Sequence, residues 1–279
     1  MSTAGGYVNT RCVRKACDRL KIPYTVHDEY GNFVSVQKQK YFFVNASMPF
    51  NSSSLNKICS DKDFASRLLK DVVRMPKTLG YFDPYPKYEK YTDYIEQTNY
   101  EAITDSICSE FSFPLIIKMN SGQQGTNVFK CATKEDVSMA LAAIFDHNSP
   151  HYDFVALVQE YIQPKAEYRV IVFRGEVLLA YEKNITDATF VGNLSPLHYE
   201  NAKAIQILDL DLLKRFQECI TPIFPILNLE FTGIDIIQDE DDKFYVIELN
   251  SRPGFTLFEK DNGDEPLVQM YEKILSSLE

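Results

Sequence analysis

Apolar strand-like runs follow one another with few intervening helices through the second half of the chain. Five such runs are present: residues 155–162, 167–173, 176–182, 232–238 and 244–250. Helical spacing of apolar residues occurs in separate stretches and does not alternate one by one with the strands. The α+β class, in which strands and helices form segregated layers, therefore fits better than a doubly wound sheet with regular βαβ units.

The chain is predicted to divide into three parts. Residues 1–56 combine a short helical stretch from Arg11 with strands near Tyr24 and Tyr41, and the serine-rich residues 51–54 are predicted to be a loop. Further strand and helix patterns follow in the rest of the chain. We expect a short N-terminal α/β domain, an N-subdomain with a glycine-rich loop, and a C-subdomain with an acidic hairpin, at residues 1–56, 57–157 and 158–279.

Composition excludes several classes of protein. The chain has 29 Lys and Arg against 39 Asp and Glu, a formal net charge of -10, and no stretch that concentrates basic residues. An extended nucleic-acid surface is therefore not expected. Six scattered cysteines without a C-x-x-C pair indicate reduced thiols. Neither a signal peptide nor an apolar run of about 18 residues is visible, so we expect a cytoplasmic protein without a membrane span.

Two glycines lie in a short polar segment between two apolar strands. The segment reads SGQQG from Ser121 to Gly125, and Lys118 ends the strand before it. Glycines let successive backbone N–H groups point at an anion, and a lysine can reach a phosphate as a point charge. A hairpin loop without any ligand explains the segment equally well by itself. The apolar strands on both sides and the lone lysine favour a phosphate-binding loop.

Two carboxylates and an amide converge on one predicted hairpin. Apolar strands flank the acidic turn 239–242, and alternation places Asp235, Glu248 and Asn250 on one face. A turn of two or four residues puts Asp235 opposite Val246, so that Asp235 and Glu248 become diagonal neighbours about 7–8 Å apart. Such oxygen ligands suit Mg²⁺. The alternative is an exposed polar face, but the surrounding apolar residues argue for burial and hence for a cation partner.

Seven short segments resemble the ATP-grasp superfamily in their order and spacing. They are DK at 61–62, MPKT at 75–78, IK at 117–118 with the loop at 121–125, VQEYI at 158–162, EYR at 167–169, GID at 233–235 and ELNSRPG at 248–254. The branch that they resemble is the carboxylate–amine ligases, which include glutathione synthetase of the bifunctional bacterial type, cyanophycin synthetase and the ribosomal-protein glutamate ligase. The resemblance covers about residues 58–275. It implies an ATP-grasp fold in which two α+β subdomains clasp ATP.

The resemblance also implies roles for individual residues. Mg²⁺, or Mn²⁺ in its place, would be held by Asp235, Glu248 and Asn250. The carboxylate, the acyl phosphate and the triphosphate would face Arg252, Arg169 and Lys183. ATP would be bound by Lys77, Lys118, Ser121, Gly122, Gln123, Gln124, Gly125, Thr126, Gln159, Glu160, Tyr161, Ile162, Glu167 and Asn193. A surface ion pair between Glu167 and Arg169, two apart on one strand, is the alternative for those two residues.

The implied reaction joins a carboxylate to an amine at the expense of ATP. The carboxylate of a small molecule or peptide would form an acyl phosphate, which an amine then attacks to give an amide. The N-terminal part is shorter than this branch usually has, and Arg252 stands where a small residue is usual. A homodimer could complete the pocket. The rival hypotheses are an ATP-grasp kinase, a nucleotide-binding scaffold without activity, and an unrelated α+β binding module.

Overall fold

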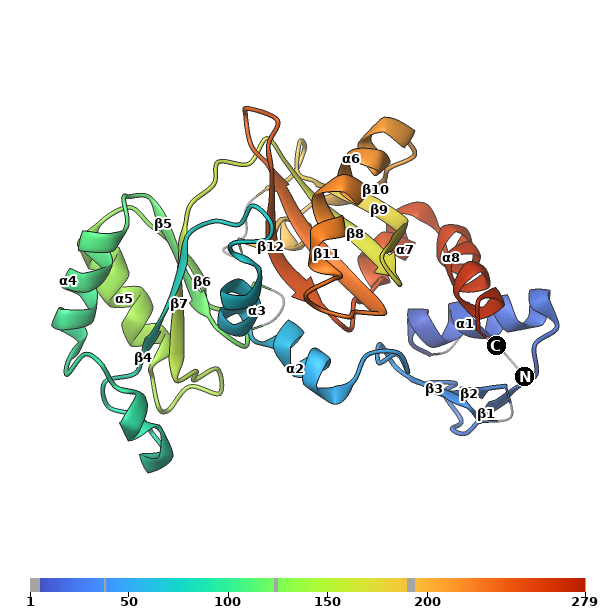
Figure 1. The fold of residues 1–279 in the computed structure, drawn as a ribbon, viewed down its shortest axis with the longest axis horizontal. Helices are drawn as coiled ribbons and strands as arrows, with labels where there is room; N and C mark the ends of the chain where they lie inside the picture. The colour runs from blue at the N-terminus through green and yellow to red at the C-terminus, as the bar shows by residue number, and fades with distance from the viewer. Residues whose placement is uncertain (1–5, 38, 123–124, 190–193, 279) are drawn as a thin grey trace.

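The part of the chain that the structure describes contains three antiparallel sheets, which follow one another along the molecule (Figure 1). This computed structural model describes residues 6–37, 39–122, 125–189 and 194–278. Strands pair with antiparallel neighbours in every sheet, and helices cover the sheet faces. The α+β class predicted from the segregated strand runs is therefore confirmed.

The middle sheet, named for its place in the sequence, lies at one end of the molecule in Figure 1 and has four strands in the order β4-β7-β5-β6. Its strands are β4 (Thr78–Phe82), β5 (Leu115–Met119), β6 (Val128–Cys131) and β7 (Val155–Glu160). Two helices, α4 (Tyr100–Glu110) and α5 (Lys134–Ile144), lie together on one side of it (Figure 1). Helix α5 begins with a capping box between Thr133 and Asp136. The apolar faces of both helices form one core with β5 and β7.

The C-terminal sheet has five strands in the order β10-β9-β8-β11-β12. Its strands are β8 (Ala166–Phe173), β9 (Glu176–Asn184), β10 (Lys203–Gln206), β11 (Phe231–Gln238) and β12 (Phe244–Asn250). Alternate residues of β8 enter different cores, Val170 and Val172 on one face and Ile171 and Phe173 on the other. This sheet is therefore buried on both faces, which explains its nearly continuous apolar runs.

Two short helices before the middle sheet pack against the C-terminal sheet. They are α2 (Ser53–Ser60) and α3 (Lys62–Leu69), and Ala65 and Leu69 of α3 share a core with Val246 and Leu249 of β12. The loop predicted at 51–54 is present at residues 51–52 only. Ser53 and Ser54 begin α2, because Ser52 caps this helix by accepting a hydrogen bond from the N–H of Leu55. Helix α6 (Leu210–Ile220) covers the same core.

The N-terminal segment shares its core with the C-terminal end of the chain. Its elements are α1 (Val8–Leu20), β1 (Tyr24–Val26), β2 (Phe33–Val36) and β3 (Tyr41–Val44). They pack beside α7 (Thr256–Asn262) and α8 (Glu265–Ser276), and Cys12 and Val34 lie in one cluster with Tyr271. The expected boundary after residue 157 falls inside β7. The three-part division thus stays a prediction, and the N-terminal part packs as a continuation of the C-terminal core.

Three 3₁₀ turns complete the described elements: η1 (Glu89–Tyr94), η2 (Pro196–His198) and η3 (Thr221–Ile223). Across the residues that the structure describes, the helices are too short or too polar to cross a bilayer.

Candidate functional site

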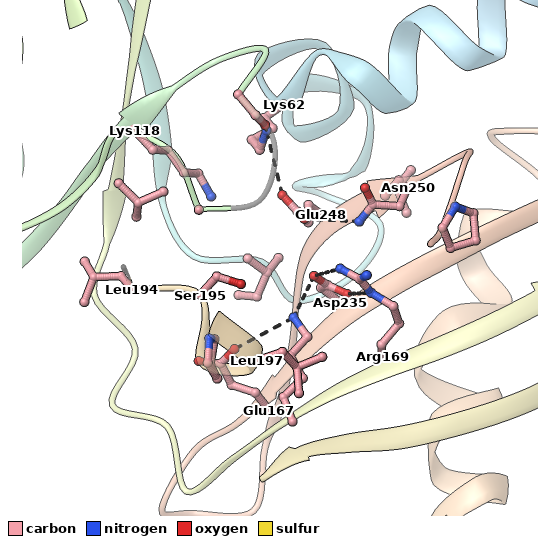
Figure 2. Close-up of a pocket in the computed structure, with 18 of the residues that line it drawn as sticks. Lys62, Lys118, Glu167, Arg169, Leu194, Ser195, Leu197, Asp235, Glu248 and Asn250 are labelled. Carbon is pink, nitrogen blue, oxygen red and sulfur yellow. Dashed lines mark hydrogen bonds and ion pairs between the residues drawn. The ribbon is translucent and has the colours of Figure 1, made fainter. Parts of the chain in front are cut away.

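A cavity of about 960 Å³ lies between the middle sheet and the C-terminal sheet. Side chains of β5 and β7 line it from the middle sheet, and side chains of β8, β9, β11 and β12 line it from the C-terminal sheet. Figure 2 shows charged side chains from both sides pointing into this space. Ligands bind preferentially in such concave sites between subdomains.

The acidic hairpin places its two carboxylates closer in register than the sequence predicted. Asp235 pairs directly with Glu248, and Ile236 pairs with Val246. The expected pairing of Asp235 with Val246 is wrong, because a register shift between Asp235 and Ile236 leaves one extra residue on β12. The irregularity keeps both carboxylates on one sheet face while it brings them opposite each other.

Asp235 is buried beside two cations, one on the adjacent strand β8 and one on β9, the strand beyond it. Arg169 of β8 donates two hydrogen bonds to it, from Nε to Oδ1 at 2.6 Å and from an η nitrogen to Oδ2 at 2.7 Å. Lys183 of β9 donates to Oδ2 at 2.8 Å. Burial by itself would raise the pKa of Asp235, but Arg169 and Lys183 hold it well below its usual range. The predicted alternative of a surface pair between Glu167 and Arg169 is therefore wrong.

Glu248 and Asn250 lie on the neighbouring edge strand, close to a lysine from another element. Asn250 donates to Oε1 of Glu248 at 3.1 Å, and Nζ of Lys62 lies 3.8 Å from Oε2. Figure 2 shows Glu248 between Lys62 and the Asp235 cluster. Among the described residues, Asp235 accepts hydrogen bonds from two cations, whereas Glu248 forms a longer ion pair with Lys62.

Lys118 approaches the same space from the middle sheet. Its side chain is buried, and Nζ donates to the Gln159 side chain at 3.0 Å. Burial lowers the pKa of Lys118 to about 8, although Glu248 opposes the shift. An anion bound beside this ammonium would raise its pKa again. Lys118 and Gln159, both predicted to bind nucleotide, thus line the cavity together.

The described part of the glycine loop also borders the cavity. Ser121, Gly122, Gly125 and Thr126 line it, whereas Gln123 and Gln124 lie outside the described residues. Gly125 has a φ of 71°, a conformation that favours glycine. A Cβ atom on Gly122 would lie 2.9 Å from the Cβ of Met119, so this position has no room for a side chain.

The strand end at β7 and the start of β8 form another wall. Glu160, Tyr161, Ile162 and Glu167 line the cavity there. Nζ of Lys130 lies 3.8 Å from the ring centroid of Tyr161. Burial raises the pKa of Glu167, and Lys183 opposes this shift from 4.0 Å away. Asn193, which was also predicted to bind nucleotide, lies outside the described residues.

The structure places the predicted site residues Arg252 and Lys77 differently from each other. Arg252 lines the cavity and is exposed. Lys77 is absent from the described lining: its Nζ donates to the Glu110 carboxylate at 2.8 Å and to the Glu110 carbonyl at 2.7 Å. The structure therefore does not bring Lys77 to the phosphate side of the cavity, because its side chain is held at the end of α4.

Lys62 is the site residue to which sequence reasoning assigned no role. Its Nζ donates to the carbonyl of Gly122 at 2.6 Å and to that of Asn120 at 3.3 Å, so it connects the glycine loop with Glu248. A usable signal was present, because DK at 61–62 is one of the segments through which the chain resembles the ATP-grasp superfamily. Its distance from both motifs along the chain concealed the contact.

Comparison with known families gives a clear assignment. The family described as RimK-like ATP-grasp domain matches residues 85–274, which is more than half of the 279-residue chain. The chain belongs to this ATP-grasp family. The match spans the glycine loop, both strands of the acidic hairpin and the cavity wall at β7 and β8.

Individual relatives of this ATP-grasp chain are distant. It is 23% identical over 236 residues to D-alanine–D-alanine ligase B of Clostridium perfringens (strain 13 / Type A), covering 83% of this chain and 70% of the relative. It is 28% identical over 178 residues to a probable alpha-L-glutamate ligase of Enterobacter sp. (strain 638), covering 63% and 54%. The chain spans about half the length of several relatives, for example 48% of a D-alanine–D-alanine ligase of Haemophilus ducreyi (strain 35000HP / ATCC 700724).

Solved structures show the same ATP-grasp architecture. The VanG D-Ala:D-Ser ligase of Enterococcus faecalis matches with a TM-score of 0.58 at 20% identity, over 78% of this chain and 61% of that chain. A D-alanine–D-alanine ligase of Bacillus anthracis matches with a TM-score of 0.54 at 21% identity, over 78% and 66%. At such identities the likeness establishes the fold, and the predicted ATP-grasp fold is confirmed.

Proposed function

We propose that this protein is an ATP-dependent carboxylate–amine ligase that forms an amide bond through an acyl phosphate. One observation carries the proposal. Asp235, Glu248 and Asn250 share a sheet face in one cavity, and Lys118 of the middle sheet and Lys62 of α3 line the same cavity. An array of oxygen ligands facing ammonium groups fits a metal–triphosphate complex. The names of the curated relatives, which are ligases, support the same reaction class.

The donor set fits Mg²⁺, which would neutralise phosphate charge when bound. Glu248 and Asn250 would hold it, since both residues border the cavity and the ion pair of Glu248 with Lys62 is long, at 3.8 Å. Asp235 already accepts hydrogen bonds from Arg169 and Lys183, so it would contribute through the remaining lone pairs of its carboxylate. Mg²⁺ commonly uses few protein ligands and completes its shell with phosphate oxygens and water.

The remaining charged residues would position the phosphates and the reacting carboxylate. Lys118 from the middle sheet and Lys62 from α3 would contact phosphate oxygens, with backbone N–H groups of the glycine loop beside them. Arg169 and Lys183 would stabilise the charge that develops during phosphoryl transfer. Glu167 would accept hydrogen bonds from the ribose. Catalysis then depends on positioning and charge neutralisation, and no covalent enzyme intermediate is required.

The acceptor end of the cavity would receive a small anionic substrate. Arg252 lies there with Tyr7 and the loop at Asn45, Ala46 and Ser47. A guanidinium and a phenol are both hydrogen-bond donors to a carboxylate. An amino acid or the end of a peptide fits this part of the cavity, and the N-terminal segment supplies its wall.

The test is ADP release from Mg²⁺-ATP across a panel of amino acids and short peptides, with hydroxylamine present to trap an acyl phosphate as a hydroxamate. We expect ADP release that depends on a carboxylate substrate. Phosphate recovered on a stable hydroxyl product would identify a kinase and reject ligation.

The matched variants are Glu248→Gln and Glu240→Gln. Glu248→Gln keeps the shape of the side chain but removes a metal-binding charge, so ADP release should fall by about 10²-fold or more, in line with the loss of one charge-stabilising group. Glu240 lies in the exposed turn of the same hairpin, and Glu240→Gln should retain activity. Equal activity in both variants would contradict the proposed site.

A further inference from the structure

Helix α3 packs its apolar face against the C-terminal sheet and also contacts β4 of the middle sheet, although it precedes both sheets in the chain. Below, the C-terminal sheet with α3 is one subdomain, and the middle sheet with α4 and α5 is the other. Ala65 and Leu69 are buried with β12, and the segment after the helix pairs with that strand through a backbone hydrogen bond from Val246 N–H to the Arg74 carbonyl at 2.9 Å. Helix α3 is therefore attached to the strand that carries Glu248 and Asn250.

Asn120, the first residue after β5, hydrogen-bonds to the N-terminus of α3 from the middle sheet. It is 4% exposed. Its Nδ2 donates to Oδ1 of Asp61 at 2.8 Å, and its Oδ1 accepts the N–H of Asp63 at 2.9 Å. Asp61 itself caps the helix through the N–H of Phe64 at 3.1 Å. Two of the otherwise unsatisfied helix donors are thus bonded, one by a residue of each subdomain.

The next residue, Ser121, is bonded to the middle sheet's own subdomain. The N–H and the hydroxyl of Ser121 both donate to Oδ2 of Asp153, at 2.8 and 2.7 Å. Asp153 is buried and follows α5, so Ser121 is fastened within the middle subdomain. The loop entry, residues 120–122, is therefore held by both subdomains at consecutive positions.

The carbonyls of this loop entry also place Lys62. Nζ of Lys62 donates to the Asn120 and Gly122 carbonyls, which holds the ammonium at the cavity 3.8 Å from Glu248. A shift of Asn120 relative to α3 would displace both the ammonium and the backbone of the loop entry.

We infer that the Asn120–Asp61 contact is an intersubdomain clasp that positions the glycine-loop entry and Lys62 over the carboxylates of β12. Asn120 is a positioning residue because it acts through the loop and Lys62. It couples the phosphate-facing elements of one subdomain to the metal-facing strand of the other. Its effect on nucleotide binding rests on the proposed function, whereas the mechanical coupling does not.

The clasp can be broken and rebuilt by exchanging its two side chains. Asn120→Asp places two negatively charged carboxylates next to each other and removes the hydrogen bond between the two side chains. The exchange variant, with Asp61→Asn and Asn120→Asp, restores one amide and one carboxylate. Asparagine and aspartate are both good N-caps, so the exchange preserves the cap of α3. Asn148→Asp, at an exposed position of the same subdomain, controls for the added charge.

The first readout is amide hydrogen exchange of the free protein. Asn120→Asp should speed exchange at Asp63 and Gly122 relative to Asn148→Asp, and the exchange variant should return it toward the wild-type rate. Unchanged exchange in Asn120→Asp, or no recovery in the exchange variant, would overturn the clasp. This measurement needs no ligand.

The second readout is the Kd of Mg²⁺-ATP by calorimetry. Asn120→Asp should weaken binding by about tenfold, the equivalent of one hydrogen bond, and the exchange variant should recover most of it. Wild-type affinity in Asn120→Asp would overturn the link from clasp to nucleotide. A wild-type protein that binds no Mg²⁺-ATP would instead overturn the proposed function, and hydrogen exchange would still decide the clasp.

Discussion

At the scale of single residues, the site depends on how buried charges are compensated. Asp235 accepts hydrogen bonds from Arg169 and Lys183, whereas the hydrogen bond of Lys118 among the described residues goes to the neutral amide of Gln159. The pKa of Asp235 is therefore held low and that of Lys118 falls to about 8. A buried ammonium whose hydrogen-bond partner is a neutral amide, at a cavity wall, is suited to receive an anion.

Nucleotide affinity should therefore depend on pH through Lys118. Bound phosphate raises the pKa of Lys118 above about 8, so the complex holds a proton that the free protein loses at higher pH. Mg²⁺-ATP affinity is then fully present below pH 8 and falls as pH rises through and above that value. Calorimetry from pH 6.5 to about 9.5 measures it, with Lys118→Met as the control that removes the ionising group. A wild-type affinity that stays constant over this range would contradict the role of Lys118.

The lysines of the DK segment at 61–62 and of the MPKT segment at 75–78 should behave differently. Lys62 faces Glu248 and the loop carbonyls, whereas Lys77 is paired with Glu110. Lys62→Ala should weaken Mg²⁺-ATP binding by about tenfold or more, as expected for the loss of one charge-assisted hydrogen bond. Lys77→Ala should change the Kd less than twofold, a difference below about 0.5 kcal/mol. The reverse order of effects would restore Lys77 as the phosphate ligand.

At the scale of elements, helix α3 links the two sheets that border the cavity. Its apolar face is buried against β12, and its N-terminus contacts the glycine-loop entry. The irregular pairing in β12 similarly decides how close Asp235 and Glu248 lie. Short elements with such contacts determine the geometry of the site more than the long helices on the outer faces do.

The attachment of α3 to β12 can be tested in its core. Leu69 is fully buried, so Leu69→Ala leaves a cavity and should lower the free energy of unfolding by about 2–5 kcal/mol. Urea unfolding measures this change. Leu68→Ala is the matched control on the same helix because Leu68 is exposed, and it should cost less than about 1 kcal/mol. Similar losses in the two variants would show that α3 does not pack as described.

At the scale of the whole molecule, the two ends of the chain form one core. Helix α1 packs on α8, and Arg19 of α1 forms an ion pair with Glu265 of α8. The N-terminal segment also supplies Tyr7 and Ser47 to the cavity wall. It therefore contributes to stability and to the candidate acceptor end at the same time.

Removal of residues 1–50 should prevent stable folding of the remainder. Val268, Tyr271 and Ile274 of α8 would lose the apolar partners that bury them, and a large exposed apolar patch promotes aggregation. Expression of residues 51–279 followed by circular dichroism and gel filtration checks this. A monomeric, cooperatively folding product would instead support the independent N-terminal domain that the sequence predicted.

The sequence by itself determined the elements and the chemistry of the site residues. Strands β8, β11 and β12 lie within one residue of the predicted apolar runs, because apolar patterning acts over neighbouring positions. The shared face of Asp235, Glu248 and Asn250 followed from strand alternation in the same way.

Only the tertiary structure decided which distant groups meet. The pairing of Asp235 with Glu248, the approach of Lys62, the diversion of Lys77 to Glu110 and the packing of α1 on α8 involve partners far apart in the chain. Local patterns do not encode such contacts, because they arise from the packing of whole elements and from the pairing of buried charges. The candidate site residues could be identified from the sequence, but their arrangement in space depends on the tertiary fold.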